Sequence, residues 1–342
     1  MNDNTHPTLQ AMAAVDRVQR LYAAQRAASL AQPCPSADER IERLRLLKRQ
    51  TQRYQDLLAG AMSADFGYRP AAESKMLDLL GSVLDANHAI SHVRRWMRPS
   101  RRSTELLFLG NRLKVTYQPK GVVGVIVPWN FPIYLAMGPL VTALAAGNRV
   151  MIKMSEVTPA TNAVFKRLLG EAFSEDLVAV VGEELIDPNV FTSRPFDHIV
   201  FTGSPQVGRI VMRTAAQNLT PVTLELGGKS PAVVSRHYPL ADAARRITHG
   251  KSVNCGQICI APDYALVPRE SVDPFVAAVK TSFQAMYGGH TEGNPNVTSV
   301  VSDRQLQRLQ AALDDARAKG ATVTACAPLP ATGNRQLPLH IV

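Results

Sequence analysis

Apolar positions recur at helical spacing through most of the first hundred residues. Ser36 and Glu39 form an S-x-x-E capping box, and the apolar residues that follow it up to Ala61 predict an amphipathic helix. The segment Phe66–Pro70 contains Gly and Pro and ends that helix. A second helix is predicted over Ala71–Trp96.

After these helices the apolar period becomes that of strands. Leu106–Leu109 and Leu113–Tyr117 flank Gly110-Asn111, which predicts a two-residue β-hairpin. From Gly121 on, apolar runs of strand length alternate with helical segments. The predicted strands are Val122–Val127, Val150–Lys153, Leu177–Val181, His198–Phe201 and Val222–Leu224. The helices predicted between them are Ile133–Ala146, Pro159–Phe173 and Pro205–Ala216.

This alternation predicts a βαβ series, and therefore an α/β fold with a doubly wound parallel sheet that binds ligands at the carboxyl ends of its strands. A second α/β segment follows, with helices near Pro239–Asn254, Ser271–Tyr287 and Ser302–Lys319. The C-terminal stretch APLPATGNRQLPLHIV ends on an apolar, strand-like segment.

Composition and charge narrow the class of protein only slightly. The 342 residues are 46% hydrophobic and 19% charged, values typical of a globular protein with two or three domains. The net charge of +10 attracts anions in general. Residues 121–148 carry no charge, but Pro128, Pro132 and Pro139 interrupt them, so we predict no membrane span.

Four cysteines are too few for a disulfide scaffold and suit a reducing compartment. The N-terminus lacks a basic region followed by an apolar run, so we predict no secretory signal and a cytoplasmic protein. Cys255 and Cys259 have no second Cys or His pair nearby at metal-ligand spacing, so we predict no metal site.

Cys259 is a candidate nucleophile. In NCGQICIAP, Gly256-Gln257 and Pro262 mark a turn at a helix end, where a thiol can be acidified and exposed. One alternative is an inert, buried thiol. Another is that Cys255, four residues earlier, is the nucleophile or an oxidation partner.

Two polar residues follow predicted strands directly. Glu225, in LELGGKSP, can serve as the base that activates water, or it forms an ion pair with Lys229 or an arginine. Gly227-Gly228 beside it lets a backbone or a ligand approach closely. Asn130, in PWNFP, can donate its amide to an oxyanion, or it caps its own turn.

Gly203 and Gly208 lie at a strand-to-helix junction within FTGSPQVG, which matches neither GxGxxG nor a Walker loop. A Gly-Ser turn that opens a helix presents N–H groups to a phosphate, although many βα loops look similar. Lys153 and Glu156 end the second strand of the series and either hydrogen-bond ribose hydroxyls or form an ordinary surface pair.

A run of arginines is the one feature that suggests nucleic acid. It lacks a binding motif and indicates a solvated helix end or a subunit contact, so we predict no nucleic-acid partner. The run consists of Arg94, Arg95, Arg98, Arg101 and Arg102.

The motifs PWNFP, IKMSEVTP, FTGSPQVG, LELGGKSP and GQICIAP occur in this order, and with them the chain resembles the aldehyde dehydrogenase superfamily over nearly its whole length. The continuation APDY after Cys259 is similar to the class 3 branch. The stretch LLFLGNRLKVTYQPKGVVGVIVPWNFP is similar to bacterial coniferyl aldehyde dehydrogenases.

The resemblance implies oxidation of an aromatic or cinnamyl aldehyde to the acid with NAD(P)+. Cys259 would form a thiohemiacetal whose oxyanion is held by the Asn130 amide and the Cys259 N–H. Glu225 would activate the water that hydrolyses the thioester.

The resemblance also implies where the cofactor binds. Lys153 and Glu156 would hold the adenosine ribose, and Ser204 with its neighbouring glycines would face the pyrophosphate. The full cofactor set is Lys153, Glu156, Gly203, Ser204, Gly208, Trp129, Leu226 and Gly227. Because the Glu156 carboxylate repels a 2′-phosphate, we expect NAD, with NADP as an option that class 3 members often accept.

The implied domains are the N-terminal helices of the cofactor domain (1–103), an oligomerisation-type hairpin (104–119), the NAD(P)-binding domain (120–225) and a partial catalytic domain (226–342). The partners would be an aldehyde and, for a complete chain, a second copy in a homodimer.

The chain departs from the family pattern at two places. Met154 stands where the family usually has Pro, and we expect it to loosen one turn. No segment matches the later Glu-Ile-Phe-Gly-Pro motif or the C-terminal oligomerisation strand, so we expect a truncated chain. Two other hypotheses are a catalytically silent nucleotide- or partner-binding fragment and a cysteine hydrolase without nicotinamide.

Overall fold

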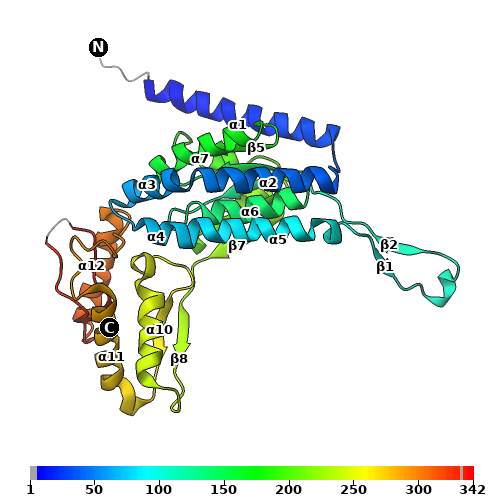
Figure 1. Cartoon of the computed structure of the whole chain (residues 1–342). Coiled ribbons are helices and arrows are strands. Elements are labelled where there is room, and N and C mark those ends of the chain that lie inside the picture. Colours follow the sequence, from blue (N-terminus) through cyan, green and yellow to red (C-terminus); the bar gives the residue numbers. More distant parts are fainter. Residues whose placement is uncertain (1–5, 332–333) are drawn as a thin grey trace. The chain divides into compact units, whose positions relative to one another are not determined.

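The computed structural model describes residues 6–331 and 334–342 (Figure 1). Residues 1–5 and 332–333 lie outside the described residues. The first of these ranges belongs to the N-terminus, for which no secretory signal was predicted, and the second to the C-terminal stretch. The chain forms two compact units. One consists of Met1–Leu58 and Met76–Glu225, and the other of Ala59–Lys75 and Leu226–Val342.

The first unit is built on a five-stranded sheet of order β5-β4-β3-β6-β7. These strands are β3 (Val122–Ile126), β4 (Arg149–Lys153), β5 (Val178–Val181), β6 (His198–Gly203) and β7 (Val222–Leu226). Strands β3 to β6 are parallel, and Val125 lies opposite both Ile152 and Val200. The predicted parallel sheet is therefore confirmed.

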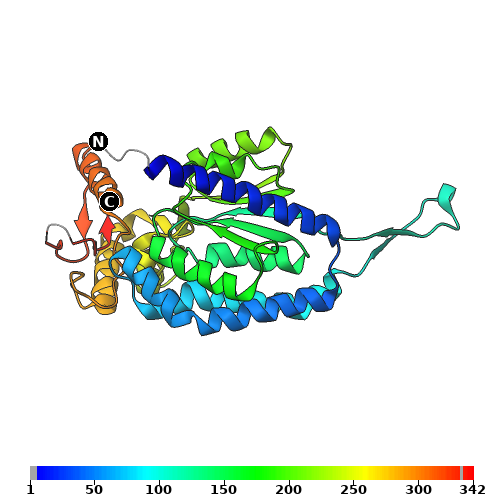
Figure 2. The same ribbon diagram turned by 90° about the horizontal axis from the view of Figure 1, so that it is seen from above.

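Helices cover both faces of this sheet (Figure 2). On one face lie α1 (His6–Ala31), α8 (Asn189–Thr192) and α9 (Pro205–Ala216). On the other lie α6 (Tyr134–Ala145) and α7 (Pro159–Ala172), with α2 (Ala37–Arg53) and α5 (Gly81–Trp96) packed outside them. The sheet is therefore doubly wound, as the sequence predicted.

Local signals explain where these helices begin and end. The predicted capping box opens α2: Ser36 Oγ accepts from the Glu39 N–H at 3.3 Å, and Glu39 Oε2 accepts from the Ser36 N–H at 2.7 Å. These hydrogen bonds lower the pKa of Glu39 to about 2. Gly147, with φ +89°, follows α6, because a left-handed residue after a helix favours glycine.

Helix α1 packs the buried residues Ala14, Val18 and Leu21 into the apolar core of the first unit, and polar groups also tie it to the sheet. The fully buried Gln25 donates to the Val150 carbonyl at 2.9 Å. Arg26 contacts both carboxylate oxygens of Asp197 at 2.9 and 3.0 Å, and Asp197 accepts from the Val122 N–H at 2.7 Å. Apolar packing and polar hydrogen bonds therefore both hold α1 to the sheet.

The predicted helix over Ala71–Trp96 is helical throughout, with a π-helical segment in its middle. The segments are α4 (Ala71–Ser74), η1 (Lys75–Leu80) and α5. Within η1 the fully buried Asp78 accepts from the N–H groups of Ile133 (3.1 Å) and Tyr134 (3.0 Å). Asp78 therefore caps α6 from a distant element, directly after the PWNFP turn.

The prediction of a two-residue hairpin is wrong for its first strand, Leu106–Leu109. Strand β1 (Ser100–Arg102) pairs antiparallel with β2 (Leu113–Val115), and η2 (Leu106–Phe108) is a 3-10 turn in the loop between them. The consecutive leucines Leu106 and Leu107 are 83% and 87% exposed. They face no sheet on which a strand pattern could be buried, so the apolar run was a poor indicator of a strand.

The second unit has three principal helices, α10 (Leu240–Ser252), α11 (Val272–Tyr287) and α12 (Asp303–Ala318). Its strands pair as β8 (Ser230–Val233) with β9 (Pro262–Leu266), in parallel, and as β10 (Thr324–Ala325) with β11 (His340–Ile341), antiparallel. The short turns are η3 (Val253–Gly256) and η4 (Arg269–Ser271), and α3 (Gln55–Phe66) enters the unit from the first. Phe275, Val279 and Phe283 of α11 centre its core.

Residues 59–75 group with this second unit, although we had placed them with the N-terminal helices. The Ser299 N–H donates to the Tyr68 carbonyl at 2.9 Å. Arg335 Nη2 donates to the Phe66 carbonyl at 3.0 Å. Backbone contacts far apart in sequence therefore decide the membership of this segment.

Replacing Asp78 by alanine should destabilise the first unit. Two buried N–H groups at the start of α6 would lose their acceptor, so we expect Asp78→Ala to lower the free energy of unfolding by about 2–4 kcal/mol. Denaturant unfolding of the variant measures this loss. Asp16→Ala, on the exposed surface of α1, is the control. A loss equal to that of the control would contradict the capping role.

Candidate functional site

The carboxyl ends of strands β3, β4 and β6 carry most of the residues predicted to bind a nucleotide, and these lie in the first unit, whereas the predicted Leu226 and Gly227 belong to the second. The loop after β3 contains Trp129 and Asn130, both half-buried. Because these strands are parallel, their loops lie along one edge of the sheet. The structure therefore brings the three motifs PWNFP, IKMSE and FTGSP to a common edge.

Lys153 ends β4 with a buried side chain. Its ammonium donates to the Met154 carbonyl at 3.1 Å and to Glu156 Oε2 at 3.4 Å, while the Glu156 side chain is 70% exposed. The ion pair therefore joins a buried cation to a carboxylate that faces solvent.

The expectation that Met154 loosens this turn is not met. Its N–H donates to the Val181 carbonyl at 2.8 Å, a bond that proline cannot form, and its side chain is fully buried. The turn after β4 is therefore tied to β5.

The FTGSPQVG segment forms the end of β6 and the start of α9. Ser204 is the N-cap of α9, and its Oγ accepts from the Val207 N–H at 3.3 Å. A Cβ on Gly203 would lie 2.5 Å from Cζ of Phe201, so this ring explains the glycine. Gly208 is buried in the first turns of α9. The helix start is exposed, as an anion site at a helix N-terminus requires.

Glu225 and Leu226 form the end of β7, where the chain passes from the first unit to the second. Both residues and the following Gly227 are exposed. Lys229, considered above as an ion-pair partner of Glu225, pairs instead with Asp263 at 3.1 Å.

The two adjacent glycines differ in their surroundings. A Cβ on Gly228 would lie 3.2 Å from the Cys259 carbonyl oxygen, whereas one on Gly227 would meet no atom within 4 Å. The predicted close approach is therefore real at Gly228, and its neighbour is the backbone of the candidate nucleophile.

Cys259 lies on a turn between α10 and β9 and is half-buried. The helix end before it is the carboxyl end of α10, the negative end of the helix dipole. The predicted turn is present, but this helix does not offer a thiolate its positive end.

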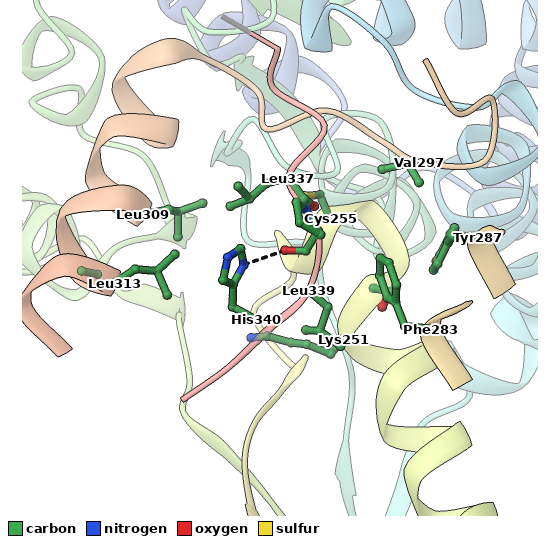
Figure 3. Close-up of a pocket in the computed structure, with 13 residues that line it drawn as sticks. Lys251, Cys255, Phe283, Tyr287, Val297, Leu309, Leu313, Leu337, Leu339 and His340 are labelled. Carbon is green, nitrogen blue, oxygen red and sulfur yellow. Dashed lines mark hydrogen bonds between the residues drawn. The ribbon is translucent and has the colours of Figure 1, made fainter. Parts of the chain in front are cut away.

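Cys255 has a different environment from Cys259. It lines an apolar cavity of about 200 Å³ in the second unit, together with residues such as Leu309, Leu313 and Phe283 (Figure 3). Its Sγ donates to the Leu337 carbonyl at 3.6 Å. Burial raises the pKa of the Cys255 thiol to about 12, so at neutral pH this thiol is protonated and a poor nucleophile.

Three residues shape these loops through contacts that the sequence did not reveal, although Gln257 was named as part of the predicted turn. They are Asp78, which caps α6, and Glu73 and Gln257, which bind the backbone around Cys259. The sequence MLDLL around Asp78 held one signal, since a carboxylate among apolar positions of a helix indicates a buried partner.

Among the residues described, no group of three or more His, Cys, Asp or Glu side chains is arranged to hold a metal ion. Within the same ranges, no helix has the length and apolarity to cross a membrane.

Comparison with known proteins agrees with this arrangement. The model of the aldehyde dehydrogenase family matches residues 2–336. A probable coniferyl aldehyde dehydrogenase of Pseudomonas aeruginosa is 49% identical over 330 residues, which are 96% of this chain and 68% of that protein. A coniferyl aldehyde dehydrogenase of a Pseudomonas species is 47% identical over 78% of this chain and 55% of its own length. The chain thus spans between about half and about two thirds of these relatives.

Solved structures extend the likeness to the fold. AldH of Staphylococcus aureus, in a substrate-bound state, has a TM-score of 0.88 at 29% identity and covers 94% of this chain, which covers 69% of it. An aldehyde dehydrogenase of Mycobacterium tuberculosis in complex with NAD+ has a TM-score of 0.83 at 29% identity, with coverages of 95% and 67%. The predicted family, α/β fold and NAD(P) cofactor class are confirmed, and the chain belongs to the aldehyde dehydrogenase family.

Proposed function

We propose that this chain carries out the oxidation of an aromatic or cinnamyl aldehyde to its carboxylic acid, with NAD(P)+ as hydride acceptor and Cys259 as nucleophile. The observation that supports it most is the contrast between its two neighbouring thiols. Cys255 is held protonated against an apolar cavity, whereas Cys259 lies on the turn outside that cavity's lining. Of the two cysteines that the sequence left open as the nucleophile, this contrast therefore favours Cys259.

The residues at the sheet edge fit the proposed cofactor. An ammonium has three N–H groups, and two of those on Lys153 have acceptors described above. Lys153 and the exposed Glu156 therefore form a donor and acceptor pair that matches the two hydroxyls of a ribose. Ser204 and the start of α9 would bind the pyrophosphate, and Trp129, Gly203, Gly208, Leu226 and Gly227 complete the proposed contacts. When bound, NAD(P)+ accepts the hydride that leaves the substrate carbon.

The chain's own groups supply the covalent chemistry in this proposal. The Cys259 sulfur adds to the aldehyde carbon, and the Asn130 amide and the Cys259 N–H hold the resulting oxyanion. After oxidation, the carbon is bound to sulfur as a thioester. Glu225 removes a proton from the water that attacks this thioester, and the acid leaves with the thiol regenerated.

The substrate class follows from the relatives, two of which are named for coniferyl aldehyde. We also propose a homodimer, because the β1–β2 ribbon carries exposed leucines, with Leu106, Leu107 and Leu109 at 83%, 87% and 69% exposure. The four cysteines are free thiols, which is consistent with the predicted cytoplasmic location.

Replacing Cys259 by alanine should abolish turnover. With coniferaldehyde and NAD+, we expect NADH absorbance to fall at least about 10³-fold in Cys259→Ala, because the covalent step is lost. Cys255→Ala is the matched control and should keep turnover within about threefold, since a protonated thiol contributes no nucleophile. Full turnover in Cys259→Ala would refute the assignment. Nucleotide binding without turnover in the parent chain would favour the silent-fragment hypothesis.

The charge of Glu156 should set the choice between NAD+ and NADP+. Glu156→Gln removes the carboxylate that repels a 2′-phosphate, a repulsion of about 1 kcal/mol for charges about 4 Å apart in water, so kcat/KM for NADP+ relative to NAD+ should rise about fivefold. Glu175→Gln, in an exposed pair with Arg17, is the control. An unchanged ratio would place the 2′-position away from Glu156.

The cysteines should differ in their rates of alkylation. At pH 8, a thiol whose pKa is about 12 is thiolate on the order of 10³ times less often than an ordinary one, so Cys255 should react far more slowly than the exposed Cys34. Its rate should rise about tenfold per pH unit up to about pH 12. Mass spectrometry after iodoacetamide treatment measures both rates, and equal labelling in the folded chain would contradict the raised pKa of Cys255.

A further inference from the structure

Three consecutive residues, ending at the glycine of the GQIC sequence, have left-handed backbone. Asn254, Cys255 and Gly256 have φ values of 51°, 52° and 72°. Such a run costs non-glycine residues on the order of 1–2 kcal/mol each, and it persists only where surrounding groups hold it. A Cβ on Gly256 would lie 2.9 Å from the Lys251 carbonyl oxygen, so the turn is also tight.

The carboxylate of Glu73 binds the first residue of this turn. Its Oε1 accepts from the Asn254 N–H at 2.7 Å and from the Thr298 hydroxyl at 3.0 Å. Asn254 and Thr298 are both buried, so water does not compete freely for these donors. Glu73 lies in α4, far away in sequence, but in the same unit as the turn.

Gln257 ties the turn from the other side. Its Nε2 donates to the carbonyls of Asn254 (2.9 Å) and Ser299 (3.0 Å), and its Oε1 accepts from the Val301 N–H at 2.9 Å. Glu73 and Gln257 thus connect the turn to the single segment 298–301. The backbone N–H and the backbone carbonyl oxygen of Asn254 are therefore both hydrogen-bonded, to Glu73 and to Gln257 respectively.

We propose that Glu73 is a positioning residue for the catalytic cysteine: its carboxylate holds the left-handed turn that sets where the sulfur and the N–H of Cys259 lie. This inference rests on the proposed role of Cys259. Glu73 itself contacts the turn, and in this proposal it touches no substrate.

The role requires an acceptor rather than a base. Glutamine at position 73 keeps a carbonyl oxygen for the Asn254 N–H and the Thr298 hydroxyl, whereas alanine leaves both buried donors without that acceptor. The conservative variant should therefore rescue the function that alanine loses. A proton-transfer role would instead make glutamine as inactive as alanine, because neither side chain can take up a proton at neutral pH.

The experiment compares Glu73→Ala and Glu73→Gln in this chain, with Glu270→Ala and Glu270→Gln as matched controls on an exposed ion pair with Arg236. At saturating NAD+ and varied coniferaldehyde, we expect kcat of Glu73→Ala to fall about 10- to 100-fold, since a misplaced nucleophile slows the chemical step. The KM for coniferaldehyde should change less than about threefold. Glu73→Gln should stay within about threefold of the parent chain.

Hydrogen exchange provides a readout that does not depend on activity. Peptides that cover residues 253–259 should exchange about tenfold faster in Glu73→Ala, while peptides of α11 stay unchanged. Thr298→Val, which removes one donor to Glu73 and keeps the side-chain shape, should lower kcat about two- to fivefold and serves if Glu73→Ala does not fold.

Parent-level kcat in Glu73→Ala, or in Thr298→Val where the former does not fold, would overturn the positioning role. Loss of activity in Glu73→Gln equal to that in Glu73→Ala would also overturn it. If the parent chain shows no turnover that depends on Cys259, the proposed function fails, and exchange at residues 253–259 then decides alone whether Glu73 holds the turn.

Discussion

Backbone N–H groups in irregular segments need acceptors, and two carboxylates on one helical stretch meet this need for both loops of the proposed chemistry. Asp78 accepts from the first residues of α6, and Glu73 accepts from Asn254 in the left-handed turn. The two residues are near neighbours in sequence, but each acts within its own unit. An unpaired buried N–H costs about 1–3 kcal/mol, so these loops depend on acceptors from a distant part of the chain.

The parallel sheet and the cysteine turn solve different problems. At the sheet edge, regular strands place Lys153, Trp129 and Ser204 along one line, and the proposed cofactor contacts need only such an array. The cysteine turn has no such regular support. Its geometry depends on side chains that bind its backbone, which is why the hydrogen bonds of Gln257 and Glu73 matter there.

Helices and strands with a regular apolar period could be predicted from the sequence, whereas features that depend on one hydrogen bond between distant residues could not. Regular apolar periods located β3 to β7 and α9 to within a few residues, because burial of one face enforces the period. The same reasoning failed at Leu106–Leu109, where the apolar residues have no face to cover, and it gave no sign of the polar groups of Gln25 and Arg26 that help to dock α1. Motif order led to the family and to candidate residues, but a contact such as Glu73 to Asn254 leaves no periodic signal.

Gly228 shows how a residue without any functional group can constrain a reactive one. Its Cα faces the Cys259 carbonyl so closely that any side chain there would push that peptide by a few tenths of an ångström. Even alanine, normally the mildest replacement, would have to move the backbone of Cys259, so a substitution at position 228 acts on the proposed nucleophile directly. Any effect of such a substitution would reflect the space that the cysteine backbone occupies rather than any chemistry of the glycine.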